Sequence, residues 1–192
     1  MTTADVVNTS YRPSVLEKFA ITPQKFSQLN RRGGIFISIN TYGHNGPWKD
    51  RAGFDHNAQI ATGFSTKEVN NKVPVFSPVS YLNDYLTGYL AATSAITALI
   101  YRAKYSGSYQ LKVSLAKSAM WVQELGYINH QKYINCPADD SIYPLKYSNF
   151  QGAYGTVTHV ANPVELSNWP KIKLRPLEPY GASKAEWQGI KT

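Results

Sequence analysis

The chain has 192 residues, of which 43% are hydrophobic and 17% charged, and it carries a formal net charge of +8. A chain of this size buries roughly 70% of its unfolded surface, so it can fold without disulfides or a structural metal. Its one cysteine, Cys136, excludes an internal disulfide framework and fits a reducing compartment. The first ten residues lack the features of a secretory signal, and no apolar run reaches the ~20 residues of a membrane span. We therefore expect a soluble globular protein without a membrane partner.

The positive charge favours an anionic partner, such as nucleic acid, an acidic surface or a phosphorylated small molecule. Basic residues are spread from Arg12 to Lys191, whereas a nucleic-acid interface usually gathers them on one face. Dispersed solubilising charge is the simpler interpretation, so nucleic acid is not predicted as a partner.

The first forty residues predict a strand, two short helices and a second strand. A valine-rich run at 4–8 indicates a buried strand. Pro13 and the pair Thr22-Pro23 are each placed to begin a helix, because proline fits the first helical turn. The β-rich run 35–40 follows a glycine break, and this order of elements predicts a parallel βαβ unit.

The middle of the chain predicts a loop, three helices and one more strand. The glycine-containing stretch 41–53 indicates a loop, and 64–80 is expected to be extended and irregular. The other elements are expected as a helix at 54–63, a helix at 83–105, a strand at 109–115 and a helix at 114–128 with Ser114 as its N-cap.

Beyond residue 131 the composition changes, and six of the eleven prolines fall there. We find no helical period in this part, apart from a short turn expected at 182–187. The predicted fold class is α/β: a partial parallel, Rossmann-like sheet with flanking helices at 1–130, and an extended Pro-rich C-terminal arm at 131–192. Because so small a sheet has exposed edges, either another chain completes it or the sequence is part of something larger.

Known catalytic motifs are missing from the sequence. There is no nucleotide-binding glycine motif, no hydrolase serine motif and no zinc-binding spacing, so no metal site is predicted. A site of His44, Asp50 and His56 is conceivable, and Cys136 has no obvious activating neighbour. The glycines of the loop at 41–53 would let the backbone approach a ligand, but they equally suit a plain connection.

Asp84 stands at the head of the helix predicted at 83–105 and is the only carboxylate between Glu68 and Glu124. An acidic residue there stabilises a helix start by about 0.3–1 kcal/mol. The alternative is a carboxylate nucleophile, which a helix N-terminus and the surrounding Lys and Arg residues would hold ionised. Both interpretations require the same environment, so the residues alone leave them open.

Several segments resemble, in order, the class III CoA-transferases (the CaiB/BaiF family). They are "ADVVNTSYRPSVLEKF", "YGHNGPWKDRAGFDHNAQIATG" and "NDYLTGYLAATSAITALIYRAKYSGSYQLKVSLAKSAMW", with a weaker likeness at 152–187. The resemblance implies an enzyme that moves CoA from an acyl-CoA thioester to a carboxylic acid acceptor. It implies no permanently bound cofactor, since CoA and acyl-CoA are substrates.

By position in the motif, Asp84 matches the family's aspartate nucleophile, which implies an aspartyl covalent intermediate. Arg12 matches an arginine that lies near CoA in relatives, and the residues matching the segment that borders the pocket are Tyr42, Gly43, Phe54 and Asp55. Racemases of the same family use a histidine where this chain has Phe54, and phenylalanine cannot carry a proton. The resemblance therefore favours CoA transfer over racemisation.

Relatives begin with a long nucleotide-fold segment that has no counterpart here, and they form intertwined dimers. We therefore expect a homodimer or a companion chain that completes the fold. The alternative function is a catalytically silent, truncated remnant with a binding or structural role. The expected compartment is the cytoplasm, with mitochondria and peroxisomes left open.

Overall fold

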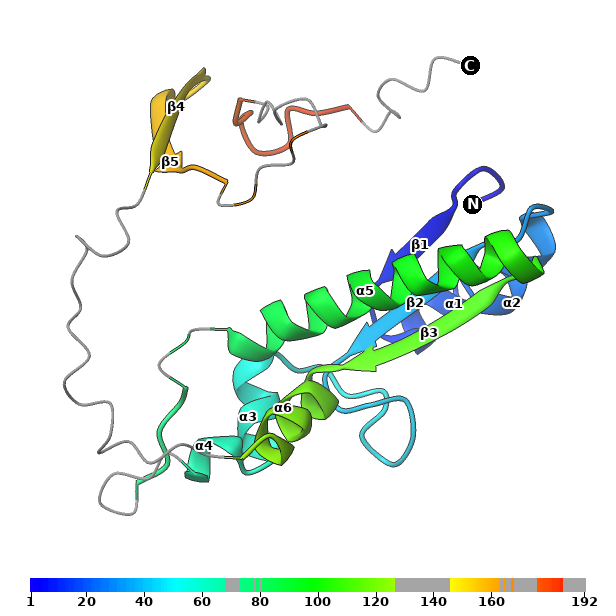
Figure 1. The fold of residues 1–192 in the computed structure, drawn as a ribbon, viewed down its shortest axis with the longest axis horizontal. Helices are drawn as coiled ribbons and strands as arrows, with labels where there is room; N and C mark the ends of the chain where they lie inside the picture. The colour runs from blue at the N-terminus through cyan, green and yellow to red at the C-terminus, as the bar shows by residue number, and fades with distance from the viewer. Residues whose placement is uncertain are drawn as a thin grey trace. The chain divides into compact units, whose positions relative to one another are not determined.

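The computed structural model describes residues 1–67, 73–77, 79, 81–126, 146–162, 164, 167 and 176–184 (Figure 1). By its internal contacts the chain divides into two units, Met1–Ile128 and Asn129–Thr192, and each is described by itself. Cys136 and the last residues of the helix predicted at 114–128 lie outside the described residues.

The first unit is built on a three-stranded parallel sheet with the strand order β1-β2-β3 (Figure 1). In register, Ile35 pairs with Val6 on one side and with Tyr109 on the other. The predicted α/β class and the partial parallel sheet are confirmed. The strands are β1 (Val6–Thr9), β2 (Ile35–Asn40) and β3 (Tyr109–Ser114).

Most helices begin where the sequence predicts. Ser114 accepts a hydrogen bond from the N–H of Lys117 at 3.3 Å, so the expected N-cap is confirmed. Thr22, at the start predicted from Pro23, also accepts one from the N–H of Lys25 at 3.1 Å. The helices are α1 (Pro13–Glu17), α2 (Pro23–Leu29), α3 (Asp55–Ala61), α4 (Phe64–Lys67), α5 (Leu82–Tyr105) and α6 (Leu115–Glu124).

Helix α4 corrects the expectation that 64–80 is irregular throughout. Gly63 has a φ of +70° and ends the preceding helical stretch, and the hydroxyl of Thr66 donates to the Gly63 carbonyl at 2.6 Å. Phe64 and Ser65 are buried, so the short turn is stabilised by packing that no local sequence pattern reveals.

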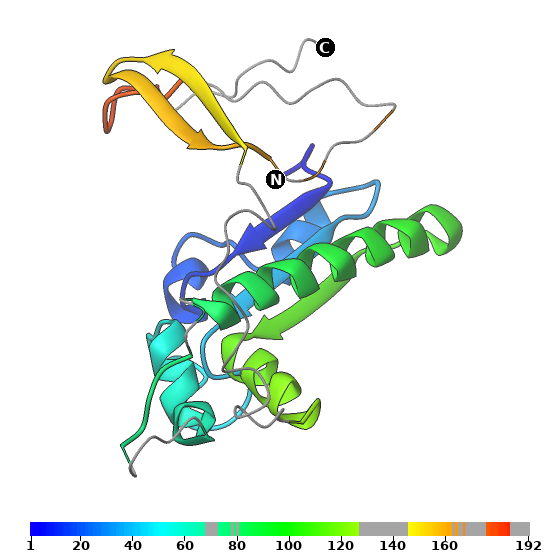
Figure 2. The ribbon, with the colours of Figure 1, turned by 60° about the vertical axis from the view of Figure 1, so that its left-hand side comes forward.

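Helix α5 covers one face of the sheet (Figure 2). Ile35 and Ile37 of β2 are buried against Ala91 and Ala98, and the small alanine side chains let the helix lie close to the strand. Alternation along β2 turns Phe36 to the opposite face, where its ring packs 6.0 Å from that of Phe26 in α2. The sheet therefore lies between α5 on one side and α2 on the other.

The direction of α5 decides where its ends lie. Only 106–108 separate α5 from β3, and the two run antiparallel, so the helix begins at the carboxyl ends of the strands and ends at their starts (Figure 1). Asp84 and Arg102 are 102 − 84 = 18 residues apart, which is about five helical turns, so they lie on the same side of α5 and about 27 Å apart.

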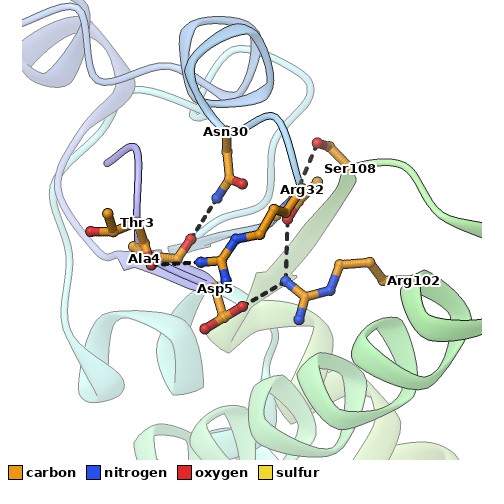
Figure 3. Close-up of polar contacts among 9 residues, drawn as sticks. Thr3, Ala4, Asp5, Asn30, Arg32, Arg102 and Ser108 are labelled. Atoms are coloured by element: carbon orange, nitrogen blue, oxygen red, sulfur yellow. Dashed lines mark hydrogen bonds and ion pairs between the residues drawn. The ribbon is translucent and has the colours of Figure 1, made fainter. Parts of the chain in front are cut away.

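Polar contacts join the starts of the strands to the end of α5 (Figure 3). Arg102 forms an ion pair with Asp5 at 2.9 Å and also donates to the Gly33 carbonyl at 3.2 Å. The amide of Asn30 donates to the Ala4 carbonyl at 2.6 Å. This end of the sheet is therefore closed by side chains from three separate parts of the chain.

In the second unit, β4 (Tyr147–Gly152) and β5 (Gly155–Val160) form an antiparallel hairpin. Gly155 has a φ of +87°, a value that glycine adopts without strain at such a turn. The sequence predicts no strand in this part, and the β-branched run at 156–158 is the local signal for one. The turn expected at 182–187 lies partly outside the described residues.

Candidate active site

Asp84 lies in the first turn of α5 with an exposed side chain. Its carboxylate accepts no hydrogen bond from any residue that the structure describes, so it is not the cap of its own helix. The residue before the helix, Tyr81, has a left-handed φ of +58°, which is uncommon for a residue other than glycine. The chain therefore turns sharply just before the predicted nucleophile.

Asp55, from the start of α3, caps α5 instead. One carboxylate oxygen of Asp55 accepts from the backbone N–H of Asn83 at 2.7 Å and from that of Asp84 at 3.0 Å. The other accepts from the side-chain amide of Gln59. Asp55 is fully buried, and its negative charge meets the positive end of the α5 dipole. A carboxylate of α3 thus caps α5, which is the stabilising role that the sequence suggested for Asp84.

Gln59 extends this contact to the next segment. Its side-chain oxygen accepts from the backbone N–H of Ser77 at 3.1 Å, so the buried pair of Asp55 and Gln59 connects α3, α5 and the segment 73–77. Figure 1 shows α3 beside the first turn of α5, where these contacts are made. The backbone that carries Asp84 is therefore held by buried charge-assisted hydrogen bonds.

The electrostatic surroundings of Asp84 differ from the expected ones. Partial burial raises the pKa of the Asp84 carboxyl above its ordinary value, the negative charge of Asp55 adds to the rise, and His56 opposes it. The alternative drawn from the sequence relied on nearby Lys and Arg residues to hold this group ionised, and none of them is among the groups that shift its pKa. The neighbour that favours the ionised form is a histidine.

His56 follows Asp55 in α3 and is packed between aromatic rings. Its ring centroid lies 4.6 Å from that of Phe76 and 5.6 Å from that of Tyr81, with both rings in edge-on orientation. These contacts fix the imidazole beside the turn that precedes α5. The site of His44, Asp50 and His56 considered from the sequence does not form, because His44 and Asp50 line a cavity of about 390 Å³ that does not include His56.

A buried polar row continues along α5. Thr87 and Ser118 of α6 share a hydrogen bond of 2.7 Å, and both side chains are buried. One turn earlier, Asn83 is fully buried, and neither of its amide atoms has a hydrogen-bond partner within the described part of the chain. A polar contact between buried hydroxyl groups therefore joins α5 to α6, one turn after buried Asn83.

The loop after β2 supplies two of the residues predicted to border the pocket. The backbone N–H and carbonyl of Gly43 are both bonded to the Asn40 side chain, at 2.8 and 2.6 Å. The ring of Tyr42 lies 5.2 Å from that of Trp48, over which Arg51 also packs. Tyr42 and Gly43 line an open cavity of about 630 Å³, together with residues of β3, α5 and α6.

The remaining predicted residues lie apart from this cavity. Arg12 is the exposed N-cap residue of α1, and Phe54 is the N-cap residue of α3 with 78% of its side chain exposed. The structure thus brings Asp55 to the backbone of Asp84, while neighbouring Tyr42 and Gly43 line a cavity that neither Arg12 nor Phe54 lines. Sequence reasoning named Asp55 without its capping role and passed over Gln59 and Asn83, because contacts between distant segments leave no local pattern.

Two further features concern binding in general. Within the described ranges, no three side chains of His, Cys, Asp or Glu come together as a metal site. Likewise, no described helix is long and apolar enough to cross a bilayer.

The chain matches the model of the family described as CoA-transferase family III over residues 1–162, and it belongs to that family. It is 35% identical over 125 residues to the acetyl-coenzyme A transferase nodX of Hypoxylon pulicicidum. That match covers 62% of this chain but 21% of the fungal protein.

Solved structures show the same fold. A variant of Rv3272 from Mycobacterium tuberculosis, in which an aspartate is replaced by alanine, matches with a TM-score of 0.60 and 26% identity, over 72% of this chain and 38% of that one. A CAIB/BAIF family protein from Brucella suis matches with a TM-score of 0.59 and 23% identity, over 80% of this chain and 41% of the other. The chain therefore spans well under half of the length of these relatives.

The family predicted from the sequence is thus confirmed, and so is the parallel-sheet fold. The predicted enzyme class, a class III CoA-transferase by resemblance, agrees with the family model and with the activity in the name of the fungal relative.

Proposed function

We propose that this chain takes part in the transfer of CoA from an acyl-CoA thioester to a carboxylic acid, with Asp84 as the nucleophile. The observation that supports the proposal is that two carboxylates at the start of α5 have different roles. Buried Asp55 binds the free N–H groups of α5, so the exposed carboxylate of Asp84 is not engaged in capping. Asp84 then has a fixed backbone and a side chain that can reach a substrate.

The proposed chemistry has two exchanges on Asp84. An oxygen of its carboxylate attacks the thioester carbonyl carbon, the C–S bond breaks with its electron pair on sulfur, and an acyl–aspartyl anhydride forms. The CoA thiolate then attacks the aspartyl carbonyl carbon and releases the first acid, which leaves an aspartyl–CoA thioester. The acceptor carboxylate attacks this thioester, the C–S bond breaks, and a second acyl–aspartyl anhydride forms. The CoA thiolate then attacks the new acyl carbonyl carbon, which gives the product acyl-CoA and releases the Asp84 carboxylate.

Acyl-CoA binding is assigned to the residues that the resemblance selects. Arg12 is exposed and carries positive charge for the phosphates of CoA, while Tyr42 and Gly43 line an open cavity and Phe54 offers an exposed ring. Asp55 is fully buried and bonded on both oxygens, so we assign it to holding the Asp84 backbone and not to contact with CoA.

The chain spans only part of the length of its relatives. Because the chain spans 38% of the Rv3272 structure, we propose that a second copy or a companion polypeptide, or further sequence, completes the site. No permanently bound cofactor is proposed, and the cytoplasm is the proposed compartment. The second candidate, a catalytically silent remnant that only binds or supports, is favoured by the same short coverage.

Trapping of the covalent intermediate tests the nucleophile. The full chain is incubated with a panel of acyl-CoA thioesters, quenched with hydroxylamine and digested for mass spectrometry. We expect a hydroxamate at Asp84 in the wild-type protein and none in Asp84→Asn. Asp50→Asn, which changes an exposed loop carboxylate, is the matched control and should label like the wild type.

The same samples separate the two candidate functions. Calorimetric binding of CoA without any label on folded protein would support the silent remnant and reject the enzyme. A label on Asp84 that appears only after a second family chain is added would support the completed site.

A further inference from the structure

The open cavity of about 630 Å³ beside the carboxyl end of β3 contains charges that have no role in the function proposed so far. Two of its lining residues are charged at neutral pH, Lys112 near the end of β3 and Lys117 in the first turn of α6. None of the described residues that line it has a carboxylate, and neither lysine forms an ion pair within the described ranges. The walls of this cavity therefore have two positive charges that no described carboxylate balances.

The smaller cavity of about 390 Å³ differs from it in charge, although the loop at 41–53 borders both. Lys112 lines the two cavities alike. In the smaller one Lys49 adds a second positive charge, but Glu17 and Asp50 line it too, so positive and negative side chains are equal in number. An anionic ligand is therefore favoured in the larger cavity and not in the smaller one.

The walls of the larger cavity are held by hydrogen bonds between distant segments. On the loop side, Nε2 of His44 lies 3.0 Å from a carbonyl oxygen of β3, and the N–H of Ala116 in α6 donates to the Thr41 carbonyl at 2.9 Å. On the helix side, the hydroxyl groups of Thr87 and Ser118 join α5 to α6 at 2.7 Å. The cavity is thus formed without a ligand, so binding there costs little rearrangement.

Apolar side chains stand beside the lysines. Leu90 of α5 and Met120 and Trp121 of α6 line the cavity and are exposed, and Tyr42 of the loop also lines it. Large apolar side chains that are exposed together mark binding surfaces. Trp121 comes four residues after Lys117, so both lie on one face of α6, where an aromatic ligand can contact the indole while its anionic group meets the ammonium.

We propose that this cavity binds an organic anion with an aromatic or apolar body, and that Lys112 and Lys117 hold its charge. Two reactants of the proposed transfer have this chemistry: the adenine nucleotide end of CoA, and an acid acceptor with a second carboxylate. The choice of either as the natural ligand rests on the proposed function, whereas the site itself rests on the cavity. Leu90 lies 90 − 84 = 6 residues after Asp84 in α5, about 9 Å along the helix axis, so a ligand held here can extend toward the nucleophile.

Titration of the full chain followed by NMR tests the site. The probes are ADP, for the nucleotide end of CoA, and terephthalate, for an aromatic acid with two carboxylates, with adenosine and benzamide as uncharged counterparts. We expect the backbone amide signals of Gly43 and Ala116, which line the cavity, to shift with at least one charged probe and not with the uncharged compounds. Because both lysines are exposed, the affinity should decrease with added salt.

Three variants separate the cavity from the general positive charge of the chain. Lys112→Gln and Lys117→Gln each remove a charge-assisted contact with the anion and should weaken binding about tenfold. Lys104→Gln is the matched control, because it removes the same charge from an exposed lysine in the last turn of α5, which does not line the cavity. It should leave the affinity unchanged. Thermal unfolding verifies that each variant is folded.

Several results would overturn the site: no shift with either charged probe at millimolar concentration, equal binding of the uncharged compounds, or unchanged affinity in both cavity variants. Equal weakening in Lys104→Gln would do the same, because the charge would then act without a defined location. Binding of ADP alone supports the site and identifies the nucleotide end of CoA as its ligand. Binding of terephthalate alone supports it and identifies the acid acceptor.

The titration requires no turnover, so the two proposals can fail separately. The probes should bind to Asp84→Asn as they do to the wild type. A protein that binds a probe in the cavity, but whose Asp84 is never labelled by acyl-CoA, would reject the nucleophile and keep the site. A labelled Asp84 in a protein that binds neither probe would reject only the site.

Discussion

The two ends of α5 carry charged residues on the same side of the helix, Asp84 in its first turn and Arg102 in its last. Arg102 is four-fifths buried and bonded to both Asp5 and the Gly33 carbonyl (Figure 3). Asp84 has an exposed carboxylate without a partner among the described residues, and buried Asp55 takes over its capping role. The charge of Arg102 is thus used in contacts that close one end of the sheet, whereas the charge of Asp84 remains free to meet a ligand.

The contrast extends to the backbone. Where the strands start, Gly33 faces Gly107 so closely that a Cβ atom on Gly33 would lie 2.1 Å from the Gly107 carbonyl oxygen. Where the strands end, Gly43 also has a positive φ, +97°, but a Cβ atom there would meet nothing within 4 Å. Close packing at one end and open space at the other are what separate a structural end from a binding end in an α/β sheet.

Gly33→Ala should have the largest effect on this comparison. The added methyl group combines a left-handed backbone with a clash against main chain, so we expect a loss of about 3–5 kcal/mol of unfolding free energy. Gly43→Ala has the same backbone cost without the clash and should lose about 1–2 kcal/mol. Urea unfolding of both variants measures the difference, and equal losses would show that the two ends are packed alike.

Asp55→Ala should have the next largest effect, at the open end. It leaves two backbone N–H groups and the amide of buried Gln59 without their acceptor, so we expect a loss of about 2–4 kcal/mol. Asp50→Ala removes an exposed carboxylate from the loop and should change stability by less than about 0.5 kcal/mol. If the two variants are equally stable in urea, Asp55 is not what holds the start of α5.

The ion pair at the closed end should contribute less than the buried cap. Asp5 is 57% exposed, and ion pairs near the surface typically contribute about 0.2–1 kcal/mol. A double-mutant cycle with Arg102→Gln and Asp5→Asn measures the coupling directly. We expect a coupling free energy in that range. It should decrease in 1 M salt, because the Debye screening length is only about 3 Å at that concentration. A coupling of zero would leave the Gly33 carbonyl as the only useful partner of Arg102.

Much of this architecture could be predicted from local patterns. Proline at the first helical turn, Thr22 and Ser114 as caps and the apolar run at 35–40 each act within a few residues, and each is found in place. The small helix α4 was not predicted, because burial of Phe64 stabilises it and not a periodic pattern. The hairpin of β4 and β5 was missed in a segment where prolines dominate the composition.

The candidate site shows even more clearly that local patterns do not predict contacts between distant residues. Asp84 could be placed at a helix start from the sequence, and the family resemblance selected it as the nucleophile. Its relation to Asp55 joins residues 29 positions apart, and the contact of His56 with Tyr81 spans 25. Such pairs form only when the helices pack, so neither the true cap nor the sign of the pKa shift follows from local sequence.

Asp84→Asn should have the smallest effect on stability, and it should raise the free energy of unfolding where the other variants lower it. Because the pKa of Asp84 is raised above 3.8, the folded chain binds its proton more tightly than the unfolded chain does. Stability therefore falls as pH rises from about 3.8 through the raised pKa, and the ionised carboxylate remains mildly unfavourable at neutral pH. Removing its charge should stabilise the chain there, within the ~0.5 kcal/mol usual for surface substitutions.

The pH dependence of that gain is the decisive measurement. Thermal unfolding of the wild type and of Asp84→Asn is compared at pH 7 and at pH 3. At pH 3 the side chain of residue 84 is neutral in both proteins. A gain at pH 7 that disappears at pH 3 means that the open end of α5 holds its charge at a cost to the fold, as a catalytic carboxylate does. Destabilisation at pH 7 would instead mean that Asp84 supports the helix, and the two ends of α5 would then serve the same purpose.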